Sequence, residues 1–364
     1  MKLGFGLMRL PRSGDGSIDI EQVKTMVDRF IQAGGTYFDT AYVYEGSEDA
    51  AREALVKRYP REAYTLATKL NAHVAKSAEE AEAQFFTSLE RTQAGYFDYY
   101  LLHALSDEDE NYRLYEKFGA WDLAKKQRDA GKIRHLGFSF HGTPELLDEL
   151  LTSHPEAEFV QLQINYADWN SPRVQSRRCW EVARSHDRPV VIMEPVKGGM
   201  LADPPGFVKS LLTEADPALS PAGWAIRFAA SLDGVLSVLS GMSSIEQMDD
   251  NLSFMKDFRP LDSDERKVIE RAQAALDTVP SIPCTGCRYC VAGCPMQIPI
   301  PGIFGAMNRN LIFGRLDDAK RRYAQETRNG GKASSCLQCG QCEAACPQHL
   351  PIIEYLKKCA EELE

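Results

Sequence analysis

The 364-residue sequence lacks any run of about 18 apolar residues, the length needed for a helix that spans a membrane. Its first residues, MKLGFGLMRLP, contain neither a long apolar segment nor a small-residue cleavage site, so we expect no signal peptide. An excess of basic residues is also missing, and a net charge of −10 argues against nucleic acid or an anionic membrane as a partner. These absences predict a cytoplasmic protein.

Disulfide bonds are also unexpected, although the chain has ten cysteines. Eight of them fall into two short motifs, CTGCRYCVAGCP (284–295) and CLQCGQCEAACP (336–347). Without an export signal, metal binding in a reducing cytosol explains this clustering better than disulfides do. Cys179 and Cys359 lie outside the motifs, and we expect both to be plain thiols.

Both motifs have the spacing C-x2-C-x2-C-x3-C-P, which is typical of ferredoxins with two [4Fe–4S] clusters. In such proteins three neighbouring cysteines bind one cluster and the fourth binds the other. The spacing therefore predicts two clusters, the first bound by Cys284, Cys287, Cys290 and Cys346, and the second by Cys336, Cys339, Cys342 and Cys294. The segment of about 40 residues between the motifs leaves an uncrossed assignment open. Zinc is the alternative metal, although zinc sites favour four cysteines in paired C-x2-C arms.

Upstream of the cysteines, short β-rich runs alternate with amphipathic helical stretches. Most of the runs are continuously apolar, as expected of strands buried on both faces, and they lie at 3–8, 36–41, 64–69, 97–103, 135–140, 159–165, 190–195 and 235–241. Eight strand-then-helix units predict an α/β fold, the (β/α)8 TIM barrel. A doubly wound open sheet is the competing architecture. The early stretch GFGLMR lacks the third glycine and the following helix of a dinucleotide-binding fingerprint, so we reject that interpretation.

The domain boundary is expected where the helical pattern of 263–279 meets the sequence PSIP. We therefore assign residues 1–280 to the barrel. Residues 281–364 are predicted to form a small, mainly α-helical ferredoxin-like domain, because 303–314, 315–328 and 352–364 have helical patterns.

Four residues with chemically useful side chains lie at the predicted carboxyl ends of barrel strands, where barrel enzymes place their catalytic groups. They are Asp39 and Tyr44 in FDTAYVYEGSE, Lys69 in LATKL and His103 in YLLHA. Together with GFGLMRLP and RHLGFSFHG, these words resemble the aldo-keto reductase family over roughly residues 1–260. The cysteine-rich tail resembles that of the iron–sulfur branch of the family.

The resemblance implies an NAD(P)H-dependent oxidoreductase that reduces an aldehyde or ketone, or oxidises the corresponding alcohol. It makes Tyr44 the proton donor, Lys69 the residue that lowers the tyrosine pKa, Asp39 the partner of the lysine, and His103 the residue that orients the substrate. The residue types suit these roles, because the unperturbed pKa of tyrosine is about 10 and a nearby ammonium group lowers it. Tyr42 is the rival proton donor.

The resemblance also implies a nicotinamide dinucleotide, NADP or NAD, extended across the top of the barrel. By family position, the carboxamide is bound by Ser139 and Gln161, the pyrophosphate by Lys197, Gly198, Gly199 and Leu201, and the adenosine end by Ser243, Gln247 and Asn251.

Three positions depart from the family pattern. Phe140 replaces an asparagine that contacts the carboxamide, and Met193 replaces a tyrosine that stacks on the nicotinamide. Neutral Gly241 or Met242 and neutral Gln247 stand where members that prefer NADP have cations for the 2′-phosphate. The sequence therefore favours neither NADH nor NADPH.

The clusters are not required by hydride chemistry. A hydride carries two electrons and a cluster accepts one, so direct exchange needs a flavin, a similar cofactor or a partner. We expect the clusters to serve electron transfer, with a one-electron redox partner, or structure. The alternative function is an iron–sulfur electron-transfer or redox-sensing protein whose barrel is a nucleotide-binding or docking module.

Overall fold

The computed structural model describes residues 1–107 and 110–364. These residues form two compact units. The first unit comprises Met1–Ala202 and Asp216–Ile269, and the second comprises Asp203–Ala215 and Glu270–Glu364.

The border between Ile269 and Glu270 lies within helix α11 (Ser263–Asp277), whereas the sequence predicts a domain boundary after this helix. The assignment of residues 1–280 and 281–364 to two domains stays a prediction.

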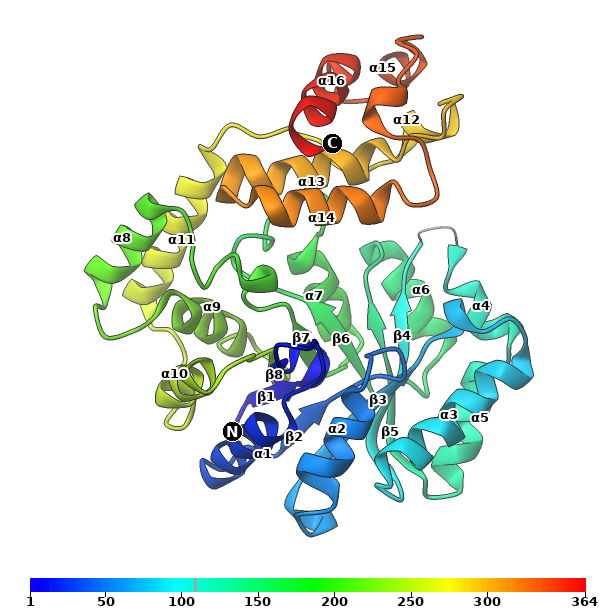
Figure 1. The fold of residues 1–364 in the computed structure, drawn as a ribbon, viewed down its shortest axis with the longest axis vertical. Helices are drawn as coiled ribbons and strands as arrows, with labels where there is room; N and C mark the ends of the chain where they lie inside the picture. Colours follow the sequence, from blue (N-terminus) through cyan, green and yellow to red (C-terminus); the bar gives the residue numbers. More distant parts are fainter. Residues whose placement is uncertain (108–109) are drawn as a thin grey trace. The chain divides into compact units, whose positions relative to one another are not determined.

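The first unit contains a closed barrel of eight parallel strands in sequential order (Figure 1). The strands are β1 (Leu3–Gly6), β2 (Tyr37–Asp39), β3 (Thr65–Leu70), β4 (Phe97–Leu105), β5 (Ile133–Phe140), β6 (Phe159–Gln163), β7 (Val190–Met193) and β8 (Val235–Ser240). Strand β8 pairs with β1, with Leu3 opposite Val238, and this pairing closes the barrel. The TIM barrel prediction is thus confirmed, and the open sheet is excluded.

Helices surround the barrel because the strands are apolar on both faces and need a cover on the outside. The α-helices of the first unit are α1 (Ile20–Gln32), α2 (Ser47–Ala51), α3 (Ala78–Thr92), α4 (Arg113–Lys117), α5 (Ala120–Asp129), α6 (Pro144–Ser153), α7 (Ser176–Ser185), α9 (Pro221–Ala230) and α10 (Ile245–Met255). Phe30 of α1 lies against Phe5 and Phe38 of the first two strands, with ring centroids 5.9 and 5.2 Å away. Such aromatic contacts fix the helix on the barrel wall.

A buried carboxylate joins three strands at the opposite end of the barrel from the candidate active site. Asp98 accepts hydrogen bonds from the backbone amide of Leu66 (2.9 Å), from Arg61 (2.6 Å) and from Arg134 (2.9 Å). Both guanidinium groups also lie over the ring of Tyr96, at 3.7 and 4.2 Å from its centroid. Since a buried charge is tolerated only when it is paired, these contacts depend on one another.

Asp98→Ala is therefore expected to lower the free energy of unfolding by about 3–5 kcal/mol, the usual effect of removing one partner of a buried ion pair. Urea denaturation followed by tryptophan fluorescence would measure it. As a control, Asp122→Ala breaks an exposed pair with Lys125 and should leave the free energy of unfolding nearly unchanged. An equal effect of the two substitutions would contradict the prediction.

The second unit is mainly helical, as the sequence predicts. Besides α11, its α-helices are α8 (Gly206–Ala215), α12 (Tyr289–Ala292), α13 (Ile300–Phe313), α14 (Leu316–Glu326), α15 (Gln341–Ala344) and α16 (Ile352–Leu363). Its apolar core includes Phe304 of α13, Tyr323 of α14 and Leu356 of α16. Nowhere in the described ranges does a helix have both the length and the apolar character needed to cross a bilayer.

Candidate active site and cysteine pockets

The candidate active site is centred on a lysine inside the barrel. Lys69, on β3, is completely buried, and its ammonium group donates hydrogen bonds to Asp39 Oδ1 (2.6 Å) and to the carbonyl oxygen of Thr40 (2.7 Å). Asp39 ends the neighbouring strand β2, so the parallel pairing of β2 and β3 brings the two side chains together.

The ion pair keeps this lysine protonated. Burial acts to lower the pKa of Lys69, but attraction to Asp39 and Tyr44 outweighs burial, and the pKa is raised. Burial raises the pKa of Asp39 as well, against the lowering effect of Lys69. An ammonium group is therefore held in a dry site next to a tyrosine.

Tyr44 lies beside Lys69 and His103, and its role as proton donor stays a prediction. The ammonium nitrogen of Lys69 lies 4.9 Å from the centroid of the Tyr44 ring, and the His103 ring meets that ring edge-on at 5.6 Å. Burial raises the pKa of Tyr44, and Lys69 offsets only part of this rise. The pKa of Tyr44 is thus raised, whereas the sequence predicts a lowered pKa. The prediction considered only the nearby lysine, because the spacing of the motif does not show how deeply the tyrosine is buried.

The rival donor Tyr42 belongs to a different set of contacts. The guanidinium group of Arg91 lies 4.7 Å from the centroid of the Tyr42 ring, and it also donates to the backbone carbonyl of Tyr42 (3.1 Å). The same arginine pairs with the buried carboxylate of Glu48. The geometry therefore places the ring of Tyr44, and not that of Tyr42, beside the side chains of Lys69 and His103.

His103 is held as a neutral imidazole. Burial lowers its pKa well below the usual value of 6.5, and the charges of Lys69, His141 and His73 act in the same direction. Its Nδ1 atom is buried and has no hydrogen-bond partner among the described residues. The hydroxyl of Tyr115 donates to the backbone carbonyl of His103, which fixes the strand end.

This burial predicts a pH dependence of stability. The unfolded chain binds a proton at His103 below about pH 6.5 and the folded chain does not, so stability falls as the pH falls through that value. Relative to His103→Gln, the wild type should lose up to about 1.4 kcal/mol per pH unit between about pH 6.5 and 5. Urea denaturation of both proteins at several pH values tests this, and parallel curves would show that His103 does not contribute.

The residues expected to bind the carboxamide are adjacent. Ser139 on β5 is directly opposite Gln161 on β6, and both are buried. The Ser139 hydroxyl accepts a hydrogen bond from the amide of Ala104 (2.7 Å). The Gln161 amide contacts Met193 through Nε2 (3.4 Å), whereas its Oε1 has no partner within the part of the chain that the structure describes.

The loop after β7 is fixed by a buried carboxylate that the sequence analysis missed. Lys197 begins the tight turn Lys197–Gly199, and its ammonium group pairs with Asp168. Asn165 donates both to Asp168 (2.9 Å) and to the carbonyl oxygen of Glu194 (3.2 Å). Burial acts to raise the pKa of Asp168, but Lys197 and the hydrogen bonds lower it below its usual range. The charge of Lys197 is therefore balanced within the protein.

The other predicted cofactor residues differ in accessibility. Leu201 and Asn251 are buried, and Asn251 accepts a hydrogen bond from Ser240 (2.7 Å) at the end of β8. Ser243 and Gln247 are exposed, and the Gln247 side chain accepts a hydrogen bond from the backbone amide of Ser243 (2.7 Å). All four lie in or beside the loops that follow β7 and β8, and their binding of a dinucleotide stays a prediction.

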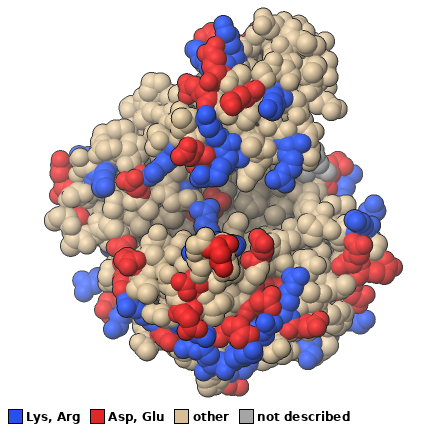
Figure 2. Space-filling model, viewed as in Figure 1, with Lys and Arg blue, Asp and Glu red and all other residues tan. Residues whose placement is uncertain are grey.

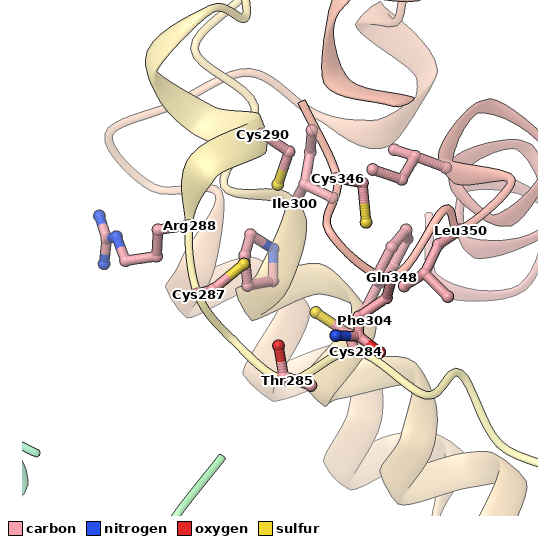
Figure 3. Close-up of a pocket in the computed structure, with 12 residues that line it drawn as sticks. Cys284, Thr285, Cys287, Arg288, Cys290, Ile300, Phe304, Cys346, Gln348 and Leu350 are labelled. Atoms are coloured by element: carbon pink, nitrogen blue, oxygen red, sulfur yellow. The ribbon is translucent and has the colours of Figure 1, made fainter. Parts of the chain in front are cut away.

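The motif cysteines of the second unit line two pockets. The first is lined by Cys284, Cys287, Cys290 and Cys346 (Figure 3), and the second by Cys294, Cys336, Cys339 and Cys342. The fourth cysteine of each motif thus lies with the first three cysteines of the other motif. This is the crossed grouping that the ferredoxin spacing predicts.

The surroundings of the two pockets differ. Besides cysteines and apolar residues, the first pocket is lined by Thr285, Arg288 and Gln348. The Arg288 side chain points away from the cysteines (Figure 3). The lining of the second pocket contains no polar side chain other than cysteine. Among the described residues, no group of three or more His, Cys, Asp or Glu side chains is arranged to hold a single metal ion.

A carboxylate braces the chain that enters the second motif. Glu364 accepts hydrogen bonds from the Tyr323 hydroxyl (2.5 Å), from the Ser334 hydroxyl (2.7 Å) and from the Ser334 amide (3.0 Å). Tyr323 in turn accepts from the amide of Ala333 (2.8 Å). The turn Ala333–Ser335, immediately before the second motif, is therefore anchored to α14 and to the end of α16.

The two remaining cysteines lie outside both pockets. Burial raises the pKa of Cys179 and of Cys359 to about 12, so both are protonated thiols at neutral pH. This agrees with the plain thiols that the sequence predicts.

Comparison with known proteins agrees with the barrel geometry. Residues 2–207, more than half of the chain, match the model of the Aldo/keto reductase family. The chain belongs to the aldo-keto reductase family. Residues 283–350 match a 4Fe-4S dicluster domain, so the chain combines an aldo-keto reductase barrel with an iron–sulfur domain.

A curated relative matches only part of the chain. A probable aldo-keto reductase 1 from Glycine max is 28% identical over 180 residues, which are 46% of this chain and 48% of the relative. The chain thus spans about half the length of the curated relative that it matches.

Solved structures resemble the fold of this aldo-keto reductase. The holo form of an aldo-keto reductase from Bacillus halodurans is 24% identical, with a TM-score of 0.59 over 74% of this chain and 91% of that chain. An aldo/keto reductase from Klebsiella pneumoniae, in complex with NADP and acetate, is 21% identical, with a TM-score of 0.59 over 74% and 90% of the two chains.

Proposed function

We propose that this aldo-keto reductase uses NADPH or NADH to reduce an aldehyde or ketone to the alcohol, or catalyses the reverse reaction, with Tyr44 as the proton donor. The observation that carries the proposal is the buried Lys69, whose ammonium group lies between the carboxylate of Asp39 and the ring of Tyr44. A charged lysine in a barrel interior is rare unless it has a chemical task.

Tyr44, Lys69 and His103 have different roles in the proposed carbonyl reduction. The reduced nicotinamide supplies the hydride when it is bound. Tyr44 donates its proton to the substrate oxygen as negative charge develops there, and the ammonium group of Lys69 stabilises the resulting tyrosinate. Neutral His103 positions the carbonyl oxygen by a hydrogen bond, because a charged imidazolium is disfavoured by burial and by Lys69.

The residues present suit a nicotinamide dinucleotide. Gln161 Oε1 is a buried acceptor that lacks a partner among the described residues, so a carboxamide N–H group would satisfy it. Gly198 and Gly199 have φ of 67° and 100°, and nothing lies within 4 Å of the position where a Cβ of Gly199 would be. Open backbone of this kind lets a phosphate group approach closely. The relative from Klebsiella pneumoniae, solved with NADP, supports the same proposal.

The pocket linings suit two [4Fe–4S] clusters. Each pocket offers four thiols, the number of ligands that one cubane cluster requires, in largely apolar surroundings. We assign the first cluster to the pocket of Cys284 and the second to the pocket of Cys336. The match to a dicluster domain supports this count.

The alternative function, one-electron transfer with the barrel as a nucleotide-binding or docking module, is favoured by the surface of the cluster loops. Cys287 and Cys339 are exposed, as are Tyr289 (66%) and Leu337 (65%) beside them. The space-filling view shows few charged side chains over α12 and α15 (Figure 2). Charged residues are depleted at the core of protein–protein interfaces, so a charge-poor surface next to these exposed cysteines suits the docking of a one-electron carrier protein.

One experiment separates the two functions. Anaerobically reconstituted protein is mixed with NADH and then NADPH, first without a carbonyl compound and then with a panel of aldehydes and ketones. Nicotinamide oxidation only when a carbonyl is present, with no bleaching of the cluster absorption, is expected for the reductase. Bleaching without any carbonyl would favour electron transfer. The reductase proposal fails if no carbonyl in the panel is reduced.

A further inference from the structure

An arginine that the sequence analysis did not consider lies among the candidate cofactor loops. Arg9 ends the tight turn Leu7–Arg9 directly after β1, and its side chain is exposed. Its Nη1 atom donates a hydrogen bond to the carbonyl oxygen of Gly198 (3.0 Å), in the loop after β7. Arg9 forms no ion pair with a carboxylate among the described residues, in contrast to Lys197, which pairs with Asp168.

The side chain of Arg9 lies against two glycines from different loops. A Cβ added at Gly198 would lie 3.5 Å from Arg9 Nη2, so the guanidinium group is next to the loop after β7. A Cβ added at Gly241 would lie 3.8 Å from Cβ and Cδ of Arg9, so the aliphatic stem is next to the loop after β8. The charged end of Arg9 is therefore at the segment assigned to the pyrophosphate, and only its apolar stem borders the segment assigned to the adenosine end.

We propose that Arg9 binds the pyrophosphate of the dinucleotide. The proposal rests on the proposed function, because it needs a dinucleotide in these loops. A guanidinium group presents a planar set of donors that matches two phosphate oxygens, and hydrogen bonds between charged groups are about twice as strong as neutral ones. Arg9 supplies the unbalanced positive charge at this place, since Lys197 is neutralised and positions 241, 242 and 247 are uncharged.

Because NADH and NADPH share the pyrophosphate, the loss of the Arg9 guanidinium group should weaken the binding of both dinucleotides equally. In the full-length protein, Arg9→Gln is expected to raise the Kd of NADH and of NADPH by the same factor, about 10-fold or more. Isothermal titration calorimetry measures both constants. The Kd of ADP-ribose, which contains the pyrophosphate but no nicotinamide, should rise by the same factor. Wild-type affinity should also fall with added salt more steeply than that of the variant.

Arg12→Gln is the matched control. Arg12 lies three residues further along the chain and is also exposed, but its guanidinium group donates to the carbonyl oxygen of Gly16 (2.7 Å) and not to Gly198. All three affinities should be unchanged in this variant. Arg9→Lys, which keeps the charge but not the planar donor set, should give intermediate affinities for all three ligands.

The outcomes are distinguishable. An Arg9→Gln protein that binds all three ligands within about twofold of the wild type overturns the proposal, because charge-assisted contacts to phosphate have larger effects. A loss confined to NADPH also overturns it, because that result would place Arg9 at the 2′-phosphate. ADP-ribose binding that depends on Arg9, in a protein that reduces no carbonyl, would support this inference and contradict the proposed reductase function. If the wild type binds none of the three ligands, both proposals fail.

Discussion

Tyr44→Phe should lower kcat for carbonyl reduction by about 10²–10⁴-fold, the usual contribution of a placed general acid. The substitution removes only the hydroxyl group, so the ring can still pack against His103 and over the ammonium group of Lys69. The Kd of the dinucleotide should therefore stay close to that of the wild type. Stopped-flow measurement of NADPH oxidation under single-turnover conditions would separate the chemical step from binding.

Tyr42→Phe provides a control within the same loop. Tyr42 meets Arg91 through its ring and its backbone carbonyl, and neither contact needs the hydroxyl. Its kcat should remain within about twofold of the wild type, because no acid–base role is removed. A large loss of kcat in Tyr42→Phe together with a small loss in Tyr44→Phe would reverse the assignment of the donor.

Cys346→Ala is expected to remove the cluster of the other motif. Cys346 lines the pocket of Cys284, Cys287 and Cys290, so its loss leaves that pocket with three thiols. About half of the iron should be lost, since each [4Fe–4S] cluster takes four cysteines. Iron analysis and electron paramagnetic resonance of the reduced protein would measure the loss and identify the cluster that remains.

Comparison among cysteine variants tests the crossing directly. The spectrum of Cys346→Ala should match that of Cys284→Ala, whereas Cys294→Ala should match Cys336→Ala. Cys359→Ala, which removes a buried thiol outside both pockets, should retain all the iron. A match between Cys346→Ala and Cys336→Ala would instead indicate that each motif binds its own cluster.

The features that could be predicted from the sequence are those with a local signature. The eight strands were recognisable as short apolar runs. The grouping of Lys69 with Asp39 was implied by the family resemblance, and it agrees with their places at the ends of neighbouring strands. Residues that end successive strands can be grouped in this way because parallel strands have their carboxyl ends at the same end of the barrel.

Features that join distant loops could not be predicted. The pairing of Lys197 with Asp168, and the position of Arg9 beside Gly198, depend on how loops after different strands fold over one another. The raised pKa of Tyr44 depends on burial that several elements create together. For the pairing of Asp168 with Lys197, the sequence offers one signal, the polar stretch after β6 that contains Asp168. Polar residues in a loop after a strand often belong to a functional site.

The shared pocket of Cys284 and Cys346 has a consequence for the synthesis of the protein. A chain emerging from the ribosome exposes the first motif well before the second, and at that stage the pocket of Cys284 has only three of its four cysteines. Neither pocket can be completed until the second motif has emerged, since the pocket of Cys294 needs Cys336, Cys339 and Cys342 as well. Cluster insertion would thus follow translation of the second motif, while the barrel ahead of it is free to fold first.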